Sequence, residues 1–183
     1  GLAPIRPWLN PAIASIENIY TVSFCEETPG FGRELVKEHV LDSEDVIIIA
    51  NPNGINCCAI EVALECKKIG TKVIGVTSRA FSEAVPLTFY ARHPSKKNLC
   101  DVVDIAIDCK QPLGDAVISI EGSSQKVAPV SGVAQLAIAN MLVIATVEEL
   151  INRGIEPPVF RSSHIPNGRE FNDKYIRELY KKI

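Results

Sequence analysis

The stretch VIIIANPNGINCCAIEVA, from Val46 to Ala63, decides the fold of this chain. Its first five residues are apolar and mostly β-branched, which predicts a buried strand over Val46–Ala50. Apolar residues then recur at helical spacing from Ile60, and Asn56 and Gly70 are residue types that begin and end helices. The stretch therefore predicts a strand, a loop and a helix in succession.

A second β-branched segment, Lys72–Ser78, completes a strand–helix–strand unit, which implies parallel strands and a right-handed crossover. The remaining expectations are a helix within Thr21–Asp45, a short helix over Arg79–Val85, a loop over Pro86–Asn98, strands over Asp101–Cys109 and Ala116–Ile120, a long helix over Ser131–Ile151, an extended segment IEPPVF, and a surface helix after Arg169. This order predicts an α/β fold with a mostly parallel sheet, in one domain spanning residues 1–183.

The bulk composition excludes several classes of protein. The formal net charge is −3 and the 19 basic residues are spread along the chain, which argues against a nucleic-acid surface. The six cysteines form no C-x-x-C pair and no zinc-ligand spacing, so we expect reduced thiols, no metal site and a cytoplasmic protein. The first residues do not resemble a signal peptide. The longest apolar stretch, Gly132–Val147, has 16 residues, whereas a membrane span needs about 20. We therefore expect a buried or interface helix there and no membrane association.

In open α/β sheets, ligands bind at the carboxyl ends of the strands. The loop Asn51–Asn56 lies at such an end, and the backbone N–H groups of Gly54, Ile55, Asn56 and Cys57 would point out of the first helical turn, where an anion is favoured. An ordinary strand-to-helix turn is the alternative interpretation. The loop is neither a Walker A sequence nor G-x-G-x-x-G, so nucleotide binding is not supported.

Other side chains are candidates with a structural alternative in each case. Cys57 lies where the helix dipole can lower a thiol pKa, although an inert small residue is the favoured interpretation. Glu121, after the fourth predicted strand, can act as a proton-transfer carboxylate or be a solvated loop residue. His164, between serines and a proline-containing loop, ranks above His93 as an acid or base. Ser131 is a natural N-cap that can also contact a ligand.

Several segments taken together resemble the sugar isomerase (SIS) domain family of phosphosugar-binding proteins, in its uncharacterised phosphoheptose-isomerase-like branch. They are DVIIIANPNGIN, IEVALECKKIGTKVIGVTS, RHPSKKNLCDVVDIAIDC, GDAVISIEGSSQKVAPVSGVAQLAIANMLV and ELINRGIEPPVFRSS. The resemblance covers about Ile47 to Asn172. It implies a three-layer α/β/α sandwich with a flavodoxin-like parallel sheet of five strands. It also implies a sugar phosphate as ligand, no cofactor, and a homodimer or higher homo-oligomer.

The chain departs from this family in two ways. The family's loop usually reads Ser-x-Ser-Gly-x-Thr, whereas Ala50, Pro52 and Asn56 occupy the hydroxyl-bearing positions here and Gly54 keeps the glycine. The family's preceding strand and its Gly/Ser loop have no counterpart, so we expect the N-terminal part of the domain to lie ahead of Gly1. Taken together, the residue patterns and the resemblance predict ligand contacts from the following residues: Asn51, Asn53, Gly54, Ile55, Asn56, Cys57, Ser78 and Ser131.

Three functions remain open from the sequence. The first is an aldose–ketose isomerase of sugar phosphates, which transfers a proton through an enediol with Glu121 as base and His164 as partner. The second is a module that senses a phosphosugar without converting it, which the altered loop favours. The third is a lyase, because GVAQ…NML also resembles the helix of etherases that act on N-acetylmuramic acid 6-phosphate. Two subunits joined through the helix Gly132–Val147 would suit all three.

Overall fold

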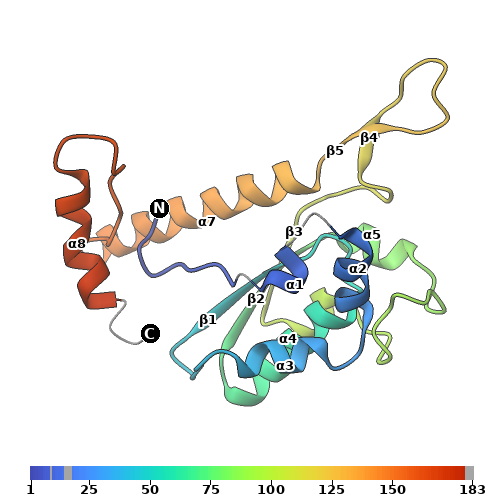
Figure 1. The fold of residues 1–183 in the computed structure, drawn as a ribbon, viewed down its shortest axis with the longest axis horizontal. Helices are drawn as coiled ribbons and strands as arrows, with labels where there is room; N and C mark the ends of the chain where they lie inside the picture. Colours follow the sequence, from blue (N-terminus) through green and yellow to red (C-terminus); the bar gives the residue numbers. More distant parts are fainter. Residues whose placement is uncertain (9, 15–17, 180–183) are drawn as a thin grey trace. The chain divides into compact units, whose positions relative to one another are not determined.

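The computed structural model describes residues 1–8, 10–14 and 18–179, and it divides into two compact units (Figure 1). One unit is Leu9–Leu136, and the other combines Gly1–Trp8 with Ala137–Ile183. Each unit is described by itself below. The prediction of a single domain over residues 1–183 stays a prediction.

The larger unit is built on a parallel sheet of β1 (Val46–Ala50), β2 (Lys72–Thr77) and β3 (Ile105–Asp108), in the order β1-β2-β3. The register aligns Val46 with Lys72 and Ile74 with Ile105. Helix α4 (Cys57–Ile69) connects β1 to β2, as the strand–helix–strand pattern predicted. The prediction of an α/β fold with a mostly parallel sheet is confirmed.

Helices pack on this sheet and on one another through a small apolar core. Helices α4 and α6 (Leu99–Val102) contact β2, and α3 (Phe31–Lys37) lies along α4. Ile60, Val73 and Leu99 are fully buried between these elements. Helix α4 ends at Gly70, whose φ of 94° is the left-handed conformation that favours glycine at this position. Helix α5 (Arg79–Ala84) follows β2 directly.

The segment before β1 contains more helices than the single one expected within Thr21–Asp45. Helix α1 covers Pro11–Ala14, α2 covers Ile19–Glu27, and α3 follows after a break. The break falls at Pro29 and Gly30, where Gly30 has a φ of 103°. Proline cannot continue a helix and glycine readily takes this φ, so the chain turns between α2 and α3.

The predicted strand over Asp101–Cys109 is wrong in its first half. Residues Leu99–Val102 form helix α6 because Asn98 and Asp101 make a capping box: each side chain accepts a hydrogen bond from the other residue's backbone N–H. Only Ile105–Asp108 pairs in the sheet. Local capping therefore outweighs the β-branched character of the two valines here.

The fourth predicted strand forms, but it lies outside the parallel sheet. Strand β4 (Ala116–Ile118) pairs antiparallel with β5 (Val127–Pro129) in a separate two-stranded sheet. Gly122, with a φ of 83°, lies in the intervening turn. The connection between these strands is too short for the crossover that a parallel pair needs, so the segment folds back as a hairpin.

The smaller unit contains most of α7 (Ser131–Asn152), together with α8 (Gly168–Leu179). An antiparallel bridge joins Leu2 to Val159 in the extended IEPPVF segment. In α8, Tyr175 is buried, and its ring meets the ring of Phe160 edge-on at a centroid distance of 6.3 Å. The long helix, the extended segment and the C-terminal helix are all confirmed.

Helix α7 has no buried residue in the part of the chain that the structure describes, in contrast to the burial expected from its sequence. Its stretch Ser131–Val147 carries no charged side chain, and Val133 and Met141 are 71% and 59% exposed. By length and composition alone this helix could cross a membrane, but one helix of this kind is weak evidence for a span. Its apolar side chains remain available for a partner.

The contact between α3 and α4 depends on Gly32. A Cβ atom added at Gly32 would lie 2.5 Å from the backbone oxygen of Cys58 and 2.8 Å from the Cβ of Glu61. We therefore expect Gly32→Ala to lower the free energy of unfolding by about 1–3 kcal/mol, measured by urea denaturation. The control is Gly132→Ala, because a Cβ there meets nothing within 4 Å. Equal stability of Gly32→Ala and the unsubstituted protein would contradict the close packing of α3 on α4.

Candidate functional site

The loop Asn51–Asn56 is closed by its own side chains. Asn51 Oδ1 accepts a hydrogen bond from the N–H of Gly54 at 2.8 Å, and Asn53 Oδ1 accepts one from the N–H of Ile55 at 3.2 Å. Two of the N–H groups predicted to hold an anion are thus already engaged. They would have to exchange these partners to bind a phosphate, and their role in ligand binding stays a prediction.

The start of α4 is buried beneath α2. The side chain of Asn56 is not a helix cap; its Nδ2 donates to Glu26 Oε2 at 3.0 Å. Burial raises the pKa of Glu26, and the Asn56 hydrogen bond opposes that rise. At Cys57, burial and then the nearby Glu61 charge raise the thiol pKa. The lowering of the Cys57 pKa considered from its helix position is therefore wrong, because burial outweighs the dipole.

Two further predicted ligand residues have structural partners. The buried Ser78 Oγ donates to the backbone oxygen of Gln111 at 2.7 Å and caps α5 by accepting from the N–H of Phe81. Ser131 donates to Asp115 through both its N–H and its Oγ, each at 2.8 Å. Both serines thus stabilise turns, and contact with a ligand stays a prediction for each.

The structure does not bring the two predicted catalytic residues together in one compact unit. Glu121 is exposed in the turn between β4 and β5, in the larger unit. His164 is exposed in a loop of the smaller unit, where its N–H donates to Ser162 Oγ at 3.3 Å. Their pairing in catalysis stays a prediction.

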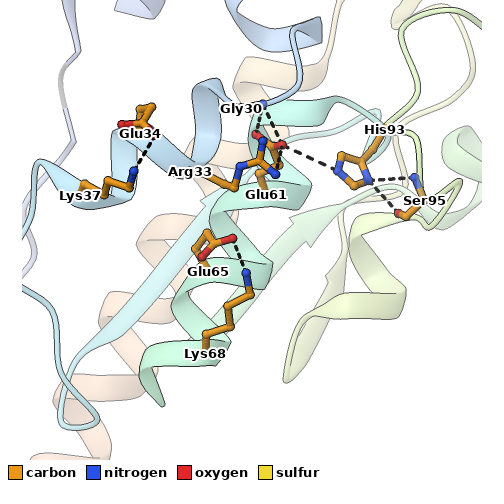
Figure 2. A network of polar contacts seen from close by, with 9 residues as sticks. All are labelled: Gly30, Arg33, Glu34, Lys37, Glu61, Glu65, Lys68, His93 and Ser95. Atoms are coloured by element: carbon orange, nitrogen blue, oxygen red, sulfur yellow. Dashed lines mark hydrogen bonds and ion pairs between the residues drawn. The ribbon is translucent and has the colours of Figure 1, made fainter.

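A buried carboxylate elsewhere in the larger unit forms a different constellation (Figure 2). Glu61, in the second turn of α4, is 3% exposed. Both of its oxygens lie 2.8 Å from the N–H of Gly30, at the start of α3. Arg33 Nη1 lies 3.6 Å and His93 Nε2 4.0 Å from Glu61 Oε1. Helices α3 and α4 and the loop after α5 therefore meet at this one carboxylate.

The hydrogen bonds of His93 determine which of its ring nitrogens carries the proton. The backbone N–H of Ser95 donates to His93 Nδ1 at 3.1 Å, and the Ser95 hydroxyl lies 2.7 Å from the same nitrogen. A backbone N–H can only donate, so Nδ1 is an acceptor and the neutral ring carries its proton on Nε2. That proton faces Glu61.

A cavity of about 400 Å³ opens beside this pair, along the flank of α4. It is lined by Arg33, Glu61, Leu64, Glu65, Lys67, Lys68 and His93. From Glu61 to Lys68 the helix rises about 10 Å, which is comparable with the length of an extended sugar phosphate. The cavity therefore offers a carboxylate and an imidazole at one end and ammonium groups at the other.

Burial favours the neutral form of His93. Burial lowers the pKa of His93, the Glu61 carboxylate raises it, and Arg33 lowers it again, with burial as the largest effect. A neutral imidazole can donate from Nε2 to a carbonyl oxygen, while a carboxylate can accept a proton from carbon. Among the described residues, no group of three or more His, Cys, Asp or Glu side chains could hold a metal ion.

Few features of the sequence point to this site. Glu61 lies among apolar residues in CCAIEVAL. A charged residue in such a stretch is either exposed or buried with a partner, and this is the signal that points to the site. Sequence alone ranks His93 below His164, because no residue near His93 in the sequence indicates that Glu61 is its neighbour in the fold. The pair joins positions 32 residues apart, which no local pattern reveals.

We expect NMR titration to give His93 a pKa below the ordinary 6.5. In Glu61→Gln this pKa should fall further, because the carboxylate charge that raises it is gone while the amide can still accept from Gly30. Protonation of His93 is harder in the folded chain than in the unfolded chain. The stability that neutral His93 contributes is therefore present above pH 6.5 and is lost as the pH falls below that value. A His93 pKa that rises in Glu61→Gln would contradict this account, and Glu34→Gln, an exposed change on α3, is the control.

The comparisons with known proteins agree with this architecture. The model of the SIS domain family matches residues 1–78. A UPF0309 protein of Halalkalibacterium halodurans is 33% identical over 99% of this chain and 73% of its own length. The UPF0309 proteins of Shouchella clausii and Geobacillus thermodenitrificans are 34% and 32% identical, over 94% and 100% of this chain and 69% and 72% of their own lengths. The chain therefore belongs to the UPF0309 family and carries an SIS domain, the type of domain that binds phosphosugars.

Proposed function

We propose that the protein is an aldose–ketose isomerase of sugar phosphates and that the reaction takes place in the cavity beside Glu61 and His93. The observation that carries the proposal is the buried carboxylate of Glu61, which lines the cavity with the Nε2 of His93 4.0 Å away. Isomerisation needs a base that can reach a carbon-bound proton and a donor that can reach the neighbouring oxygen. These two side chains supply those two roles.

In this proposal, the Glu61 carboxylate accepts the proton from the carbon next to the carbonyl. His93 Nε2–H donates a hydrogen bond to the carbonyl oxygen and stabilises the negative charge of the enediolate. Glu61 then returns its proton to the neighbouring carbon, and His93 relays the hydroxyl proton from one oxygen to the other. Glu61 retains acceptor capacity for this role, because a carboxylate has about four lone-pair positions and the shared Gly30 N–H uses only one on each oxygen.

The phosphate of the substrate is assigned to the cationic side chains of the cavity. Lys67 and Lys68 lie at the C-terminal end of α4, and Arg33 of α3 lines the same cavity beside Glu61. Lys68 is at present paired with Glu65 at 2.6 Å. This exposed pair is worth little on its own, so a doubly charged phosphate can compete for the ammonium group. In the loop Asn51–Asn56 the N–H groups of Gly54 and Ile55 already have hydrogen-bond partners, which supports placing the phosphate elsewhere.

The alternatives are tested by the same experiment. Sensing without conversion is supported by the engaged N–H groups of Gly54 and Ile55, which leave the usual phosphate loop of the family closed. An etherase-like lyase is supported only by the resemblance of α7. A homodimer or higher oligomer belongs to the proposal too, and its support is the exposed stretch Ser131–Val147 of α7, which carries no charged side chain.

The test is deuterium incorporation from heavy water into glucose 6-phosphate and fructose 6-phosphate, followed by proton NMR. We expect incorporation next to the carbonyl with the unsubstituted protein, and a rate about 10²–10⁴-fold lower in Glu61→Gln. Glu34→Gln, an exposed carboxylate change on α3, should keep the full rate.

The remaining outcomes separate the other functions. Binding of both sugar phosphates without exchange would replace the isomerase by a sensing module. Release of lactate from N-acetylmuramic acid 6-phosphate would replace it by a lyase. Full exchange in Glu61→Gln together with its loss in Glu121→Gln would move the base to the residue first predicted from the sequence.

A further inference from the structure

The guanidinium group of Arg92 is buried, with 7% of the residue exposed, and every one of its nitrogens donates a hydrogen bond. Its Nε donates to the backbone oxygen of Pro86 at 3.0 Å. Nη1 donates to Asn98 Oδ1 at 2.9 Å. Nη2 donates to the backbone oxygens of Val85, at 2.8 Å, and of Ser82. A buried charge with this set of acceptors is fixed in one geometry.

These acceptors belong to two parts of the fold. The carbonyls of Ser82 and Val85 lie at the C-terminal end of α5, whose last turn has no basic residue of its own. A cation is favoured at such an end, because the last carbonyls of a helix lack partners. Pro86 and Asn98 are the first and last residues of the loop Pro86–Asn98. Arg92 thus ties the middle of this loop to both of its ends and to α5.

The backbone on either side of Arg92 is held against the loop that precedes α4. Arg92 itself forms an antiparallel bridge with Asn56. The N–H of His93 donates to the backbone oxygen of Ile55 at 2.9 Å, and the N–H of Leu99 donates to that of Gly54 at 2.7 Å. These bonds hold the backbone of His93 beside the start of α4, within the segment that the Arg92 side chain ties together.

We infer that Arg92 is a positioning residue: by joining the end of α5 to the loop Pro86–Asn98, its guanidinium holds the imidazole of His93 beside Glu61 at the cavity. The effect on turnover rests on the proposed function, whereas the effect on the His93 ring does not. Lysine cannot replace arginine here, because an ammonium group lacks the planar fork that reaches several fixed carbonyls at once.

The test is Arg92→Lys in the full chain, with two readouts. By NMR titration, the His93 pKa should move up toward 6.5, since a loosened loop exposes the ring to water. By heavy-water exchange with fructose 6-phosphate, the rate should fall about 10–100-fold, the effect of a small displacement of a catalytic group. The matched control is Arg79→Lys on α5, the helix whose end Arg92 contacts. Arg79 is an exposed arginine paired with Glu83 at 3.6 Å. This control should change neither readout.

A second variant keeps the test decisive if Arg92→Lys does not fold. Asn98→Ser removes the acceptor of Arg92 Nη1 and keeps a residue that caps α6 well, so the His93 pKa should shift in the same direction by a smaller amount. An unchanged His93 pKa in the folded variants would overturn the inference. A shifted pKa in a protein that exchanges no sugar-phosphate proton would sustain the positioning role of Arg92 and reject the isomerase.

Discussion

The interaction on which the site depends is the hydrogen bond from the Gly30 N–H to the buried carboxylate of Glu61. A charged group at 3% exposure is costly unless it is paired and hydrogen-bonded. Here the start of α3 supplies the N–H donor, and Arg33 on the same helix supplies a positive charge at 3.6 Å. Gly32 lets α3 approach α4 closely enough for these contacts. The packing of α3 on α4 therefore supplies the groups that stabilise the charge of Glu61.

The same arrangement supports the proposal that the chemistry takes place on the flank of α4. The loop Asn51–Asn56 occupies the expected edge of the sheet, but Asn51 and Asn53 use their side chains to close it. The backbone oxygens of Ile55 and Gly54 in this loop also accept hydrogen bonds from the N–H groups of His93 and Leu99. The loop thus serves as the platform on which the histidine-bearing segment rests. On this platform the imidazole of His93 lies beside the carboxylate of Glu61.

The sequence predicted the fold much better than the site. The strand Val46–Ala50, the helix that ends at Gly70 and the long helix from Ser131 follow from periodicity and capping, which are local properties. The prediction that a strand begins at Asp101 is wrong, because a capping box stabilises a helix there despite the β-branched pattern. Glu61 escaped detection because its partners come from α3 and from the loop after α5. Only the tertiary structure brings these residues to one carboxylate.

The most direct test of this account is to locate the bound ligand by ¹⁵N–¹H chemical-shift mapping while glucose 6-phosphate is added. The account predicts saturable shifts in the amides of Arg33, Glu61, His93 and Ser95, with smaller shifts at Lys67 and Lys68. Shifts confined to the amides of Asn51–Cys57, or centred on Glu121 or His164, would contradict it.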